Sequence, residues 1–432
     1  MINERISPLG KRTFTRKQRA VSVIGIGNDG CVSLQSQAVN AVAGAQVLVG
    51  GERQLDFFPQ FSGERIVLKS GLLATLDRVA ELAEENKVCI LASGDPLFFG
   101  IGALVVRRIG ATHVEFIPAP SSMQWAFARI GLNWDDARFL SFHGRSTEGF
   151  VGRLKRLSKV ACFTDEENSP RNLACLMVEF GEAAWTAWVC ENLGGPDERV
   201  REFSIDVLAN RTDIASLNVL ILVRNDPSWK QPPLISFFHE DAFAKRMPKS
   251  GLITKREVRT LSLAAMSIRP RSIIWDVGAG SGSIAVEAAM LASEGRVYAI
   301  EVDPKGVDIC RENIRRHGVD NVHIVAGRAP EALAGIEAPD AVFVGGSKGS
   351  LDAIVEIVLG RLRSGGRIVV NAITLENISE AYKAFRTRGI TPEVTLVNVS
   401  RGVPLARYLR YEALNPVHIF SATKPQVQGD SS

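Results

Sequence analysis

Two apolar stretches that each end in a glycine-rich turn limit most strongly what this chain can fold into. The first is VSVIGIGNDG, from Val21 to Gly30, and the second is RSIIWDVGAGSGSIAVEAA, from Arg271 to Ala289. In the second stretch an apolar strand turns through several glycines and enters a helix, so backbone amides and the helix N-terminus can approach a ligand closely. This order of elements is typical of a nucleotide site in an α/β fold.

The length of the chain supports two separately cored domains. Its 432 residues are about two to three times a typical domain. The periodic pattern is weakest between Arg224 and Phe243, where prolines cluster. We therefore predict a basic, mostly disordered arm over residues 1–19, a first domain over 20–228, a linker over 229–246 and a second domain over 247–432.

Strand-like and helix-like runs alternate in both halves. The strand-like runs upstream include VSVIGIG, VLVG and VCILASGDP, and those downstream include SIIWDVG, RVYAIE, NVHIVAG and GRIVVNA. Such alternation indicates βα units and largely parallel sheets, so the predicted fold class is α/β, with a doubly wound sheet in the second domain. The two glycine loops differ in spacing and surroundings, so they do not indicate an internal repeat.

Composition disfavours several classes of protein. Apolar runs such as VLIL are far shorter than the roughly 20 consecutive apolar residues that cross a bilayer, so no membrane span is expected. Six cysteines without a C-x-x-C pair and six histidines without ligand spacing favour reduced thiols, a cytoplasmic location and no metal. The net charge of +4 is slight for a nucleic-acid binder, and a small anionic substrate explains it as well, so no nucleic-acid partner is expected.

Two acidic residues narrow the class of ligand that the second glycine loop can bind. Asp276 lies two residues before Gly278, and Glu301 ends the next predicted strand, where an acid commonly bonds ribose hydroxyls. The spacing G-x-G-x-G differs from the G-x-G-x-x-G that packs around a dinucleotide pyrophosphate. An acid before the loop would repel a pyrophosphate, whereas it could accept a hydrogen bond from the ammonium of an amino acid. Both points favour S-adenosylmethionine over NAD.

Motifs of the second half resemble those of class I, Rossmann-like methyltransferases, whose cofactor site is similar to DVGAGSGSIAVEAA and VYAIEVDP. More specifically, the second half resembles the decarboxylating precorrin methyltransferases of cobalamin biosynthesis. The motifs that together carry this resemblance are GLITKREVR, GRAPEAL, DAVFVGGSKG, GGRIVVNAITLEN and NPVHIF. This resemblance covers nearly all of residues 247–422.

The first half is similar to the tetrapyrrole methylase family through VIGIGNDG, LASGDPLFFGIG, IPAPSSMQWAFARIGLNW and ENLGGPDERV. That resemblance implies two α/β subdomains with S-adenosylmethionine in the cleft between them. Together the halves have the layout of the decarboxylating precorrin-6Y C(5,15)-methyltransferase family. It implies that two S-adenosylmethionines methylate meso carbons 5 and 15, that the ring C acetate leaves as carbon dioxide, and that precorrin-8X forms. The expected homo-oligomer also follows from these families.

The resemblance and the loop chemistry give a set of site residues. The expected cofactor contacts, one site per domain, are Gly25, Gly27, Gly94, Asp95, Pro96, Ser121 and Ser122 in the first domain, and Asp276, Gly278, Gly280, Ser281, Gly282, Glu301, Gly327, Arg328, Ala329, Gly345 and Gly346 in the second. The expected catalytic set is Thr254, Lys255, Arg259 and Ser347. Candidate anchors for substrate carboxylates are Lys255, Arg256, Arg259, Lys348, Arg401 and Arg407, and candidate substrate contacts of the first domain are His143 and Glu191.

Three other functions stay open at this point. Strand, glycine loop, helix and acid also describe NAD-dependent dehydrogenases, although the glycine spacing argues against one. A methyltransferase acting on RNA, DNA or another small molecule would share the cofactor loop, but no N/D-P-P-Y/F tetrad follows DAVFVGGS. A non-catalytic sensor of S-adenosylmethionine is the third alternative.

Overall fold

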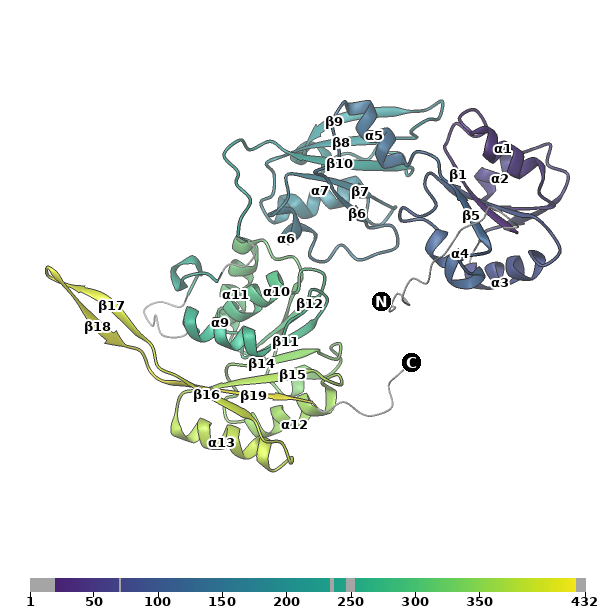
Figure 1. Cartoon of the computed structure of the whole chain (residues 1–432). Coiled ribbons are helices and arrows are strands. Elements are labelled where there is room, and N and C mark those ends of the chain that lie inside the picture. The colour runs from purple at the N-terminus through teal and green to yellow at the C-terminus, as the bar shows by residue number, and fades with distance from the viewer. Residues whose placement is uncertain (1–19, 70, 234–236, 246–252, 425–432) are drawn as a thin grey trace. The chain divides into compact units, whose positions relative to one another are not determined.

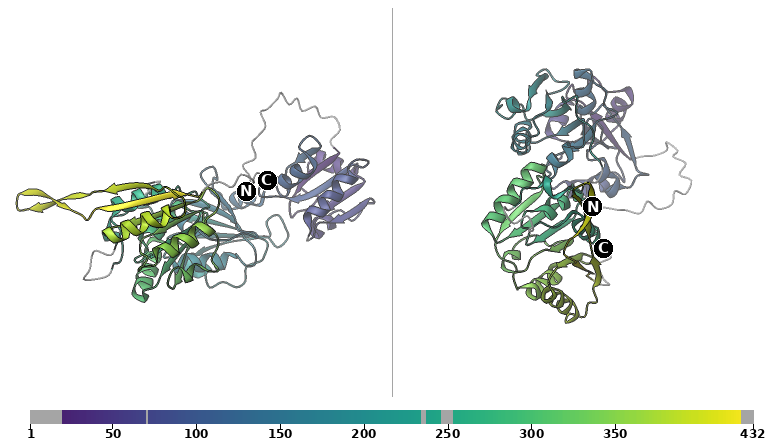
Figure 2. Two further views of the ribbon diagram at one scale, coloured as in Figure 1. Left: turned by 90° about the horizontal axis from the view of Figure 1, so that it is seen from below. Right: turned by 90° about the vertical axis from the view of Figure 1, so that its left-hand side faces the viewer.

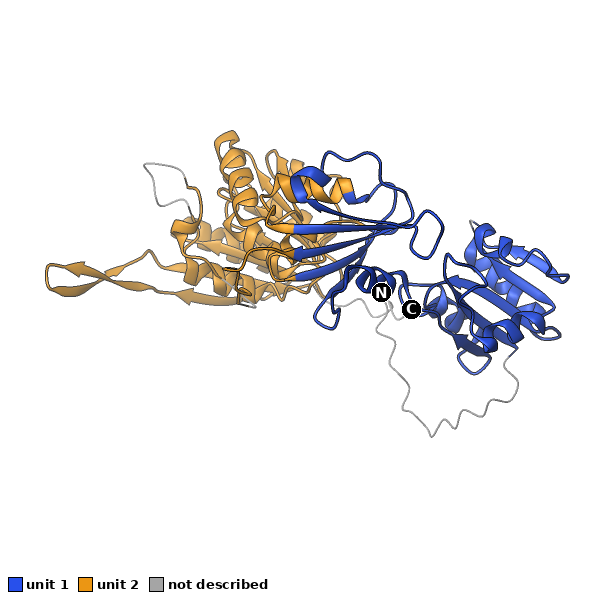
Figure 3. Cartoon of the chain, turned by 90° about the horizontal axis from the view of Figure 1, so that it is seen from above, with its two compact units in different colours: residues 1–145, 159–170, 186–223 blue, residues 146–158, 171–185, 224–432 orange. Residues whose placement is uncertain are grey.

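The computed structural model describes residues 20–424, except 70, 234–236 and 246–252. The predicted arm over 1–19 and parts of the predicted linker lie outside the described residues. The chain divides into two compact units (Figure 3). The first unit holds the chain up to residue 145 with 159–170 and 186–223, and the second holds 146–158, 171–185 and the chain from 224 onward.

A fully parallel sheet forms the first half of the first unit (Figure 1), as its alternating pattern predicts. Its strand order is β3-β2-β4-β1-β5, with β1 (Val21–Ile26), β2 (Val47–Gly50), β3 (Glu64–Val67), β4 (Val88–Ser93) and β5 (Val114–Ile117). One face packs against α1 (Ser36–Ala43) and α2 (Glu52–Asp56), and the other against α3 (Leu72–Leu82) and α4 (Gly102–Ile109). Because β1 and β4 are parallel neighbours, the glycine loop after β1 and the SGDP turn after β4 lie at one edge of the sheet.

A second, mixed sheet completes the first unit. Its order is β6-β7-β10-β8-β9, with β6 (Arg138–Ser141), β7 (Lys159–Phe163), β8 (Trp185–Glu191), β9 (Arg199–Ser204) and β10 (Asn218–Arg224), and α8 (Ile205–Leu208) follows β9. Helix α5 (Ser122–Ile130) packs on this sheet through Met123, Ala126 and Phe127. The expected pair of α/β subdomains is thereby confirmed.

The second unit is built on a seven-stranded sheet of order β13-β12-β11-β14-β15-β19-β16. Its strands are β11 (Ile273–Val277), β12 (Arg296–Glu301), β13 (Val322–Ala326), β14 (Ala341–Val344), β15 (Arg367–Ala372), β16 (Glu393–Val397) and β19 (Val417–Thr423). Helices α9 (Arg256–Ala265), α10 (Ser283–Leu291) and α11 (Pro304–His317) cover one face, and α12 (Leu351–Arg361) and α13 (Leu375–Arg386) cover the other. Strands β11 to β15 pair in parallel, which confirms the Rossmann-like expectation.

An antiparallel hairpin of β17 (Ser400–Leu405) and β18 (Tyr408–Ala413) extends away from this sheet, as two views show (Figures 1 and 2). Strand β19 is antiparallel to both β15 and β16, so β16 runs in the direction of the parallel strands. The hairpin, which follows β16, therefore leaves the carboxyl edge of the sheet. Its base is held by Arg401, which binds Glu240 and Glu257.

The second unit also takes up chain that lies upstream of the predicted linker. The carboxylate of Asp320 accepts hydrogen bonds of 3.1 Å from the backbone N–H groups of Val151 and Gly152, at the start of α6 (Phe150–Leu154). Lys155 Nζ donates to the carbonyl of His317 at 2.7 Å. Most of α7 (Pro170–Glu179) is in this unit as well.

The predicted linker is ordered where it is described. Phe238 and Phe243 pack into the core beside α9 and α10, and the short 3-10 helix η1 (Glu240–Ala242) contains the buried Glu240. The compact units differ from the predicted domains because residues 146–158 and 171–185 join the second unit. Phe238 and Phe243 of the predicted linker contribute to the core of that unit.

Candidate functional site

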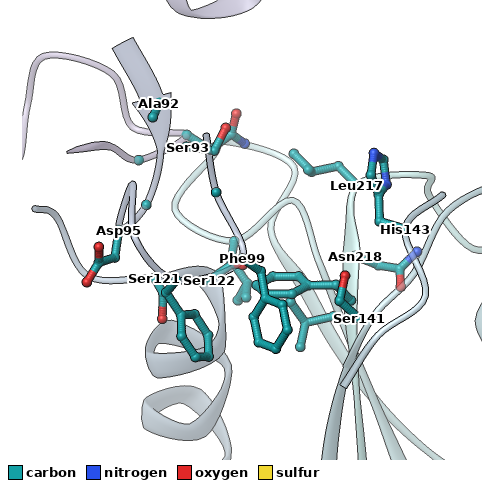
Figure 4. A pocket seen from close by; sticks show the side chains of 18 of the residues that line it. Ala92, Ser93, Asp95, Phe99, Ser121, Ser122, Ser141, His143, Leu217 and Asn218 are labelled. Atoms are coloured by element: carbon teal, nitrogen blue, oxygen red, sulfur yellow. The ribbon is translucent and has the colours of Figure 1, made fainter. Parts of the chain in front are cut away.

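The first unit contains a cavity of about 1070 Å³ at the carboxyl edge of its parallel sheet (Figure 4). Of the cofactor residues predicted for this domain, the ones that line it are Gly27, Gly94, Asp95, Ser121 and Ser122. The loops after β1, β4 and β5 supply these residues, as expected where parallel strands end side by side.

Gly25 and Pro96 are not part of the lining. A Cβ atom on Gly25 would lie 2.0 Å from the Gly94 carbonyl oxygen and 2.4 Å from the Ala119 nitrogen. Gly25 thus lets two ligand loops approach each other, which differs from the predicted direct contact with cofactor. Gly94 itself has a φ of 62°, a conformation that favours glycine.

Two of the lining side chains are held by their own loops. Asp95 Oδ1 accepts a hydrogen bond of 2.8 Å from the Leu97 N–H. Ser121 is the N-cap of α5, where its hydroxyl and the Gln124 side chain form a capping box. The turn and the helix start are therefore fixed before any ligand arrives.

The opposite wall of the cavity comes from the mixed sheet. Of the two predicted substrate contacts, His143 and Glu191, only His143 is part of the lining. His143 lines the cavity, with Nδ1 3.4 Å from the Thr164 carbonyl oxygen. Glu191 is fully buried and binds Arg199 and Arg201. Burial alone would raise the pKa of Glu191, but hydrogen bonds such as that from Arg199 lower it below its ordinary value. We correct the prediction for Glu191, because its carboxylate is already neutralised inside the protein.

Sequence reasoning missed other residues of this cavity, including Arg53, Phe99 and Arg145. Arg53 follows the GG that ends β2, so the rule that ligands bind at carboxyl ends of parallel strands could have found it. Phe99 lies within the quoted motif LASGDPLFFGIG, but only the glycine, aspartate and proline of that motif were predicted as contacts; Arg145 carries no such signal.

In the second unit the predicted glycine loop lies at the ends of β11 and β12. Gly278, Gly280 and Gly282 all have positive φ values, 74°, 55° and 73°. A Cβ atom on Gly278 would lie 2.6 Å from the Gly346 oxygen, which joins the loop after β11 to the loop after β14. At Gly282 a Cβ would meet Cys310 Sγ at 2.5 Å, so this glycine permits packing against α11.

The two predicted acids stand beside this loop. Glu301 accepts hydrogen bonds of 2.7 Å from the N–H groups of Gly280 and Asp303. Asp276 is 1% exposed; its Oδ2 accepts from the Ala285 N–H at 3.0 Å, while its Oδ1 finds no hydrogen-bond partner in the described part of the chain. Burial raises the pKa of Asp276 to about 7, and the nearby Glu301 adds to the shift. A buried carboxylate oxygen without a donor fits a ligand that brings an ammonium.

The remaining predicted loops gather at the same edge. Gly327 donates to the Glu301 carbonyl at 2.9 Å, directly after β13. Arg328 Nη2 lies 3.3 Å from the Lys348 carbonyl oxygen and so links this loop to the one after β14. Ala329 lies in the first of these loops and Gly345, Gly346 and Ser347 in the second, and Ser281 is buried within the glycine loop.

Two predicted substrate anchors, Arg259 and Arg401, are already bound by groups of the protein. Arg259 is fully buried, and its nitrogens donate to Glu287, the Thr254 carbonyl and the Phe238 carbonyl. The predicted catalytic role of Arg259 is therefore wrong, because its guanidinium is buried and already bound by the protein. Lys255, the other predicted cation of this segment, is the N-cap residue of α9 and precedes the helix that contains Arg259.

Arg401 is corrected in the same way, because its guanidinium is held by two glutamates at the hairpin base. The other predicted anchors are exposed or half-buried: Lys255, Arg256, Lys348 and Arg407. The roles of Thr254, Lys255 and Ser347 stay predictions.

Within the described residues, no group of three or more His, Cys, Asp or Glu side chains could hold a metal ion. Among the same residues, no helix has both the length and the apolarity that a membrane crossing requires.

Comparison with known proteins identifies the class. Residues 20–209 match the family of tetrapyrrole (corrin/porphyrin) methylases, and residues 245–424 match the precorrin methyltransferase domain. Together with the glycine loops at the carboxyl edges of two parallel sheets, these matches define a two-domain tetrapyrrole methyltransferase.

Individual relatives define the family. A precorrin-6Y C(5,15)-methyltransferase [decarboxylating] from Sinorhizobium sp is 35% identical over 409 residues, 94% of this chain and 96% of the relative. A probable cobalt-precorrin-6B C(15)-methyltransferase (decarboxylating) from Pyrobaculum calidifontis is 40% identical over 39% of this chain and 88% of the relative. A crystal structure of precorrin-6y C5,15-methyltransferase from Geobacter metallireducens is 38% identical and covers 45% of this chain and 100% of its own, with a TM-score of 0.42. The chain belongs to the family of decarboxylating precorrin-6Y C(5,15)-methyltransferases.

Proposed function

We propose that this chain methylates precorrin-6Y at carbons 5 and 15 with two S-adenosylmethionines and releases the ring C acetate carboxyl as carbon dioxide, giving precorrin-8X for cobalamin biosynthesis. The first domain serves carbon 5, and the second serves carbon 15 and the decarboxylation. The observation that carries the proposal is that one chain, with relatives of this name over nearly its whole length, has a glycine-lined loop cluster in each of its two units.

Methyl transfer mainly requires that the methyl group of the cofactor and the accepting carbon of the substrate be aligned. S-adenosylmethionine supplies a methyl group already activated on a sulfonium, and an electron-rich meso carbon of the substrate displaces it in line. In the second unit Asp276 Oδ1 would accept the cofactor ammonium, Glu301 the ribose hydroxyls, and the backbone of Gly278 to Gly282 would approach the ligand closely. In the first unit Gly27, Gly94 and Ser122 would do so from three loops.

Decarboxylation needs an electron sink, and the conjugated pyrrole rings of the substrate can provide one. The electron pair of the C–CO₂ bond passes into the rings, and a proton then replaces the carboxyl group. The protein contributes by removing water around the departing carboxylate and holding the others.

The test uses the intact chain with precorrin-6Y and S-adenosylmethionine, followed by mass spectrometry. The wild type is expected to add two methyl groups and lose carbon dioxide. Gly94→Val should block only the carbon 5 methylation, because Gly94 lines the first cavity with a φ of 62°. Gly278→Val should block only the carbon 15 methylation and the decarboxylation, because a side chain there meets Gly346. An unchanged substrate mass with wild-type protein that still binds S-adenosylmethionine would exclude the proposal. The expected homo-oligomer is checked separately by light scattering.

A further inference from the structure

The first cavity contains two cations that no described acid neutralises. Arg53 and Arg145 line it, and among the described residues neither forms a salt bridge, whereas nearby arginines such as Arg129 and Arg201 do. Arg53 Nη2 lies 3.4 Å from Ser93 Oγ, and its concave surroundings lower the pKa of its guanidinium by desolvation. Both side chains are exposed at the cavity wall. Arginines without a counter-ion at such a place are suited to an anionic ligand.

An aromatic residue lies beside one of these cations. The Arg145 guanidinium carbon is 5.9 Å from the centre of the Phe99 ring, and Phe99 is 43% exposed. Figure 4 shows the Phe99 side chain among the labelled lining residues. Its ring packs edge-on against Phe98 and Phe163, with centroids 4.9 and 5.8 Å away, so its position is fixed by protein contacts.

The backbone of Phe99 is unusual for an aromatic residue. Its φ of 56° lies in the left-handed region, which costs about 1–2 kcal/mol for a residue with a Cβ atom. Such strain often accompanies a functional position. Here it keeps an apolar ring at the surface of the cavity instead of in the core.

Acids of the lining are arranged differently. Asp165 accepts hydrogen bonds of 2.7 and 2.6 Å from the N–H groups of Gly144 and Asn168, so its charge stabilises backbone turns. Glu166 and Glu167 follow it directly in the lining. Asn168 also donates to the Arg145 carbonyl oxygen, so Asp165 lies close to the Arg145 backbone. A polycarboxylate is attracted by the two arginines and repelled by Glu166 and Glu167, which restricts where its carboxylates can bind.

We infer that Arg53, Phe99 and Arg145 form the tetrapyrrole subsite of the first cavity. The two arginines bind peripheral carboxylates of the substrate, and the Phe99 ring packs against its macrocycle. This inference rests on the proposed function.

The test compares Arg53→Met, Arg145→Met, Phe99→Gly and Phe99→Leu in the full chain. Arg107→Met is the matched control, since Arg107 is exposed in the same unit and is not part of the lining. Loss of one charge-assisted hydrogen bond should raise the KM for precorrin-6Y in the carbon 5 methylation about ten-fold or more. Phe99→Gly removes the ring while tolerating the positive φ, so a raised KM there reports the ring itself, and Phe99→Leu should be less affected.

Two further measurements, of cofactor affinity and of porphyrin binding, distinguish a substrate subsite from a cofactor site and from a failure of the proposed function. The affinity for S-adenosylhomocysteine, measured by calorimetry, should stay unchanged in every variant. If that affinity falls in parallel with the rise in KM, the arginines hold the cofactor and the inference is wrong. It is equally wrong if the wild type methylates precorrin-6Y and both arginine variants keep its KM. A wild type that leaves precorrin-6Y unmethylated instead refutes the proposed function. In that case fluorescence quenching by a stable porphyrin polycarboxylate still tests the subsite, because the arginine variants and Phe99→Gly should weaken binding while Arg107→Met should not.

Discussion

The buried pair of Arg259 and Glu287 allows a quantitative prediction. The two side chains are 0% and 1% exposed and lie 2.7 Å apart. Removing one partner of such a pair costs about 3–5 kcal/mol, because the other charge stays buried. For Glu287→Leu the full cost is expected, since a guanidinium cannot give up its proton. The thermal transition of the second unit should fall by about 6–20 °C, from about 2–4 °C per kcal/mol for a domain of this size.

The reverse change should cost less and depend on pH. In Arg259→Met, Glu287 can take up a proton, and burial already raises the pKa of Glu287 when Arg259 is present. A folded pKa above the unfolded value contributes stability at low pH that is lost as pH rises through the folded pKa. Arg259→Met should therefore be closest to wild type near pH 4 and lose stability toward neutral pH.

The assay is calorimetry of Glu287→Leu, of Arg259→Met and of the double variant that carries both changes, together with hydrogen exchange of α9 and α10. The double variant should recover much of the loss, though not all, because the carbonyls of Thr254 and Phe238 also lose the Arg259 donors. Additive single losses, or a Glu287→Leu variant within 1 kcal/mol of wild type, would refute the reasoning about an uncompensated buried charge.

Three further outcomes are expected. Gly25→Ala should weaken S-adenosylhomocysteine binding at the first site, seen by calorimetry, because its Cβ would lie 2.0 Å from the Gly94 oxygen; Gly360→Ala, with open space around it, is the control. The hairpin base should loosen in acid: burial raises the pKa of Glu240, but the Arg401 hydrogen bonds bring it down to about 2, so the stability this group gives is present above the unfolded pKa and is lost as pH falls through about 2. Hydrogen exchange of β17 and β18 checks this, and protection that is flat down to pH 2 would contradict it. Cofactor affinity at the second site should rise between pH 6 and 8 as Asp276 ionises, with a pKa of about 7, and Asp276→Asn should remove that rise when titrated in a Gly94→Val background.

Local patterns in the sequence were sufficient to predict the central strands of both parallel arrangements, such as β1, β4, β11 and β12, and the glycine loops that follow β1 and β11. Apolar runs such as those of β11 and β12 are buried on both faces, and glycines at their ends mark the loops. The hairpin escaped prediction because Pro404 lies within its first strand and because β18 is exposed on both faces, so its sequence needs no alternation of apolar and polar residues. Its charged base, held by Arg401, depends on contacts with residues far away in the sequence.

Side-chain roles were harder to predict for the same physical reason. Arg259 was predicted to be available to the substrate because its partner Glu287 lies on another helix, far away in the sequence. Glu191 looked available because the arginines that enclose it come from the neighbouring strand β9. A sequence shows the charge of a residue, whereas its neutralisation is decided by packing.

The composition of the second unit also determines where the chain can be divided. A cut within 229–246 respects the two family matches, but it separates α6 from Asp320, whose carboxylate accepts the Val151 and Gly152 N–H groups. It also removes Lys155 from the His317 carbonyl. A gene split at that point would produce one fragment with a frayed helix start and another with a partly buried carboxylate left without its donors. Each fragment would keep its own glycine loops. The second fragment would nevertheless be less stable than the second unit of the intact chain, because the Asp320 carboxylate has lost its donors.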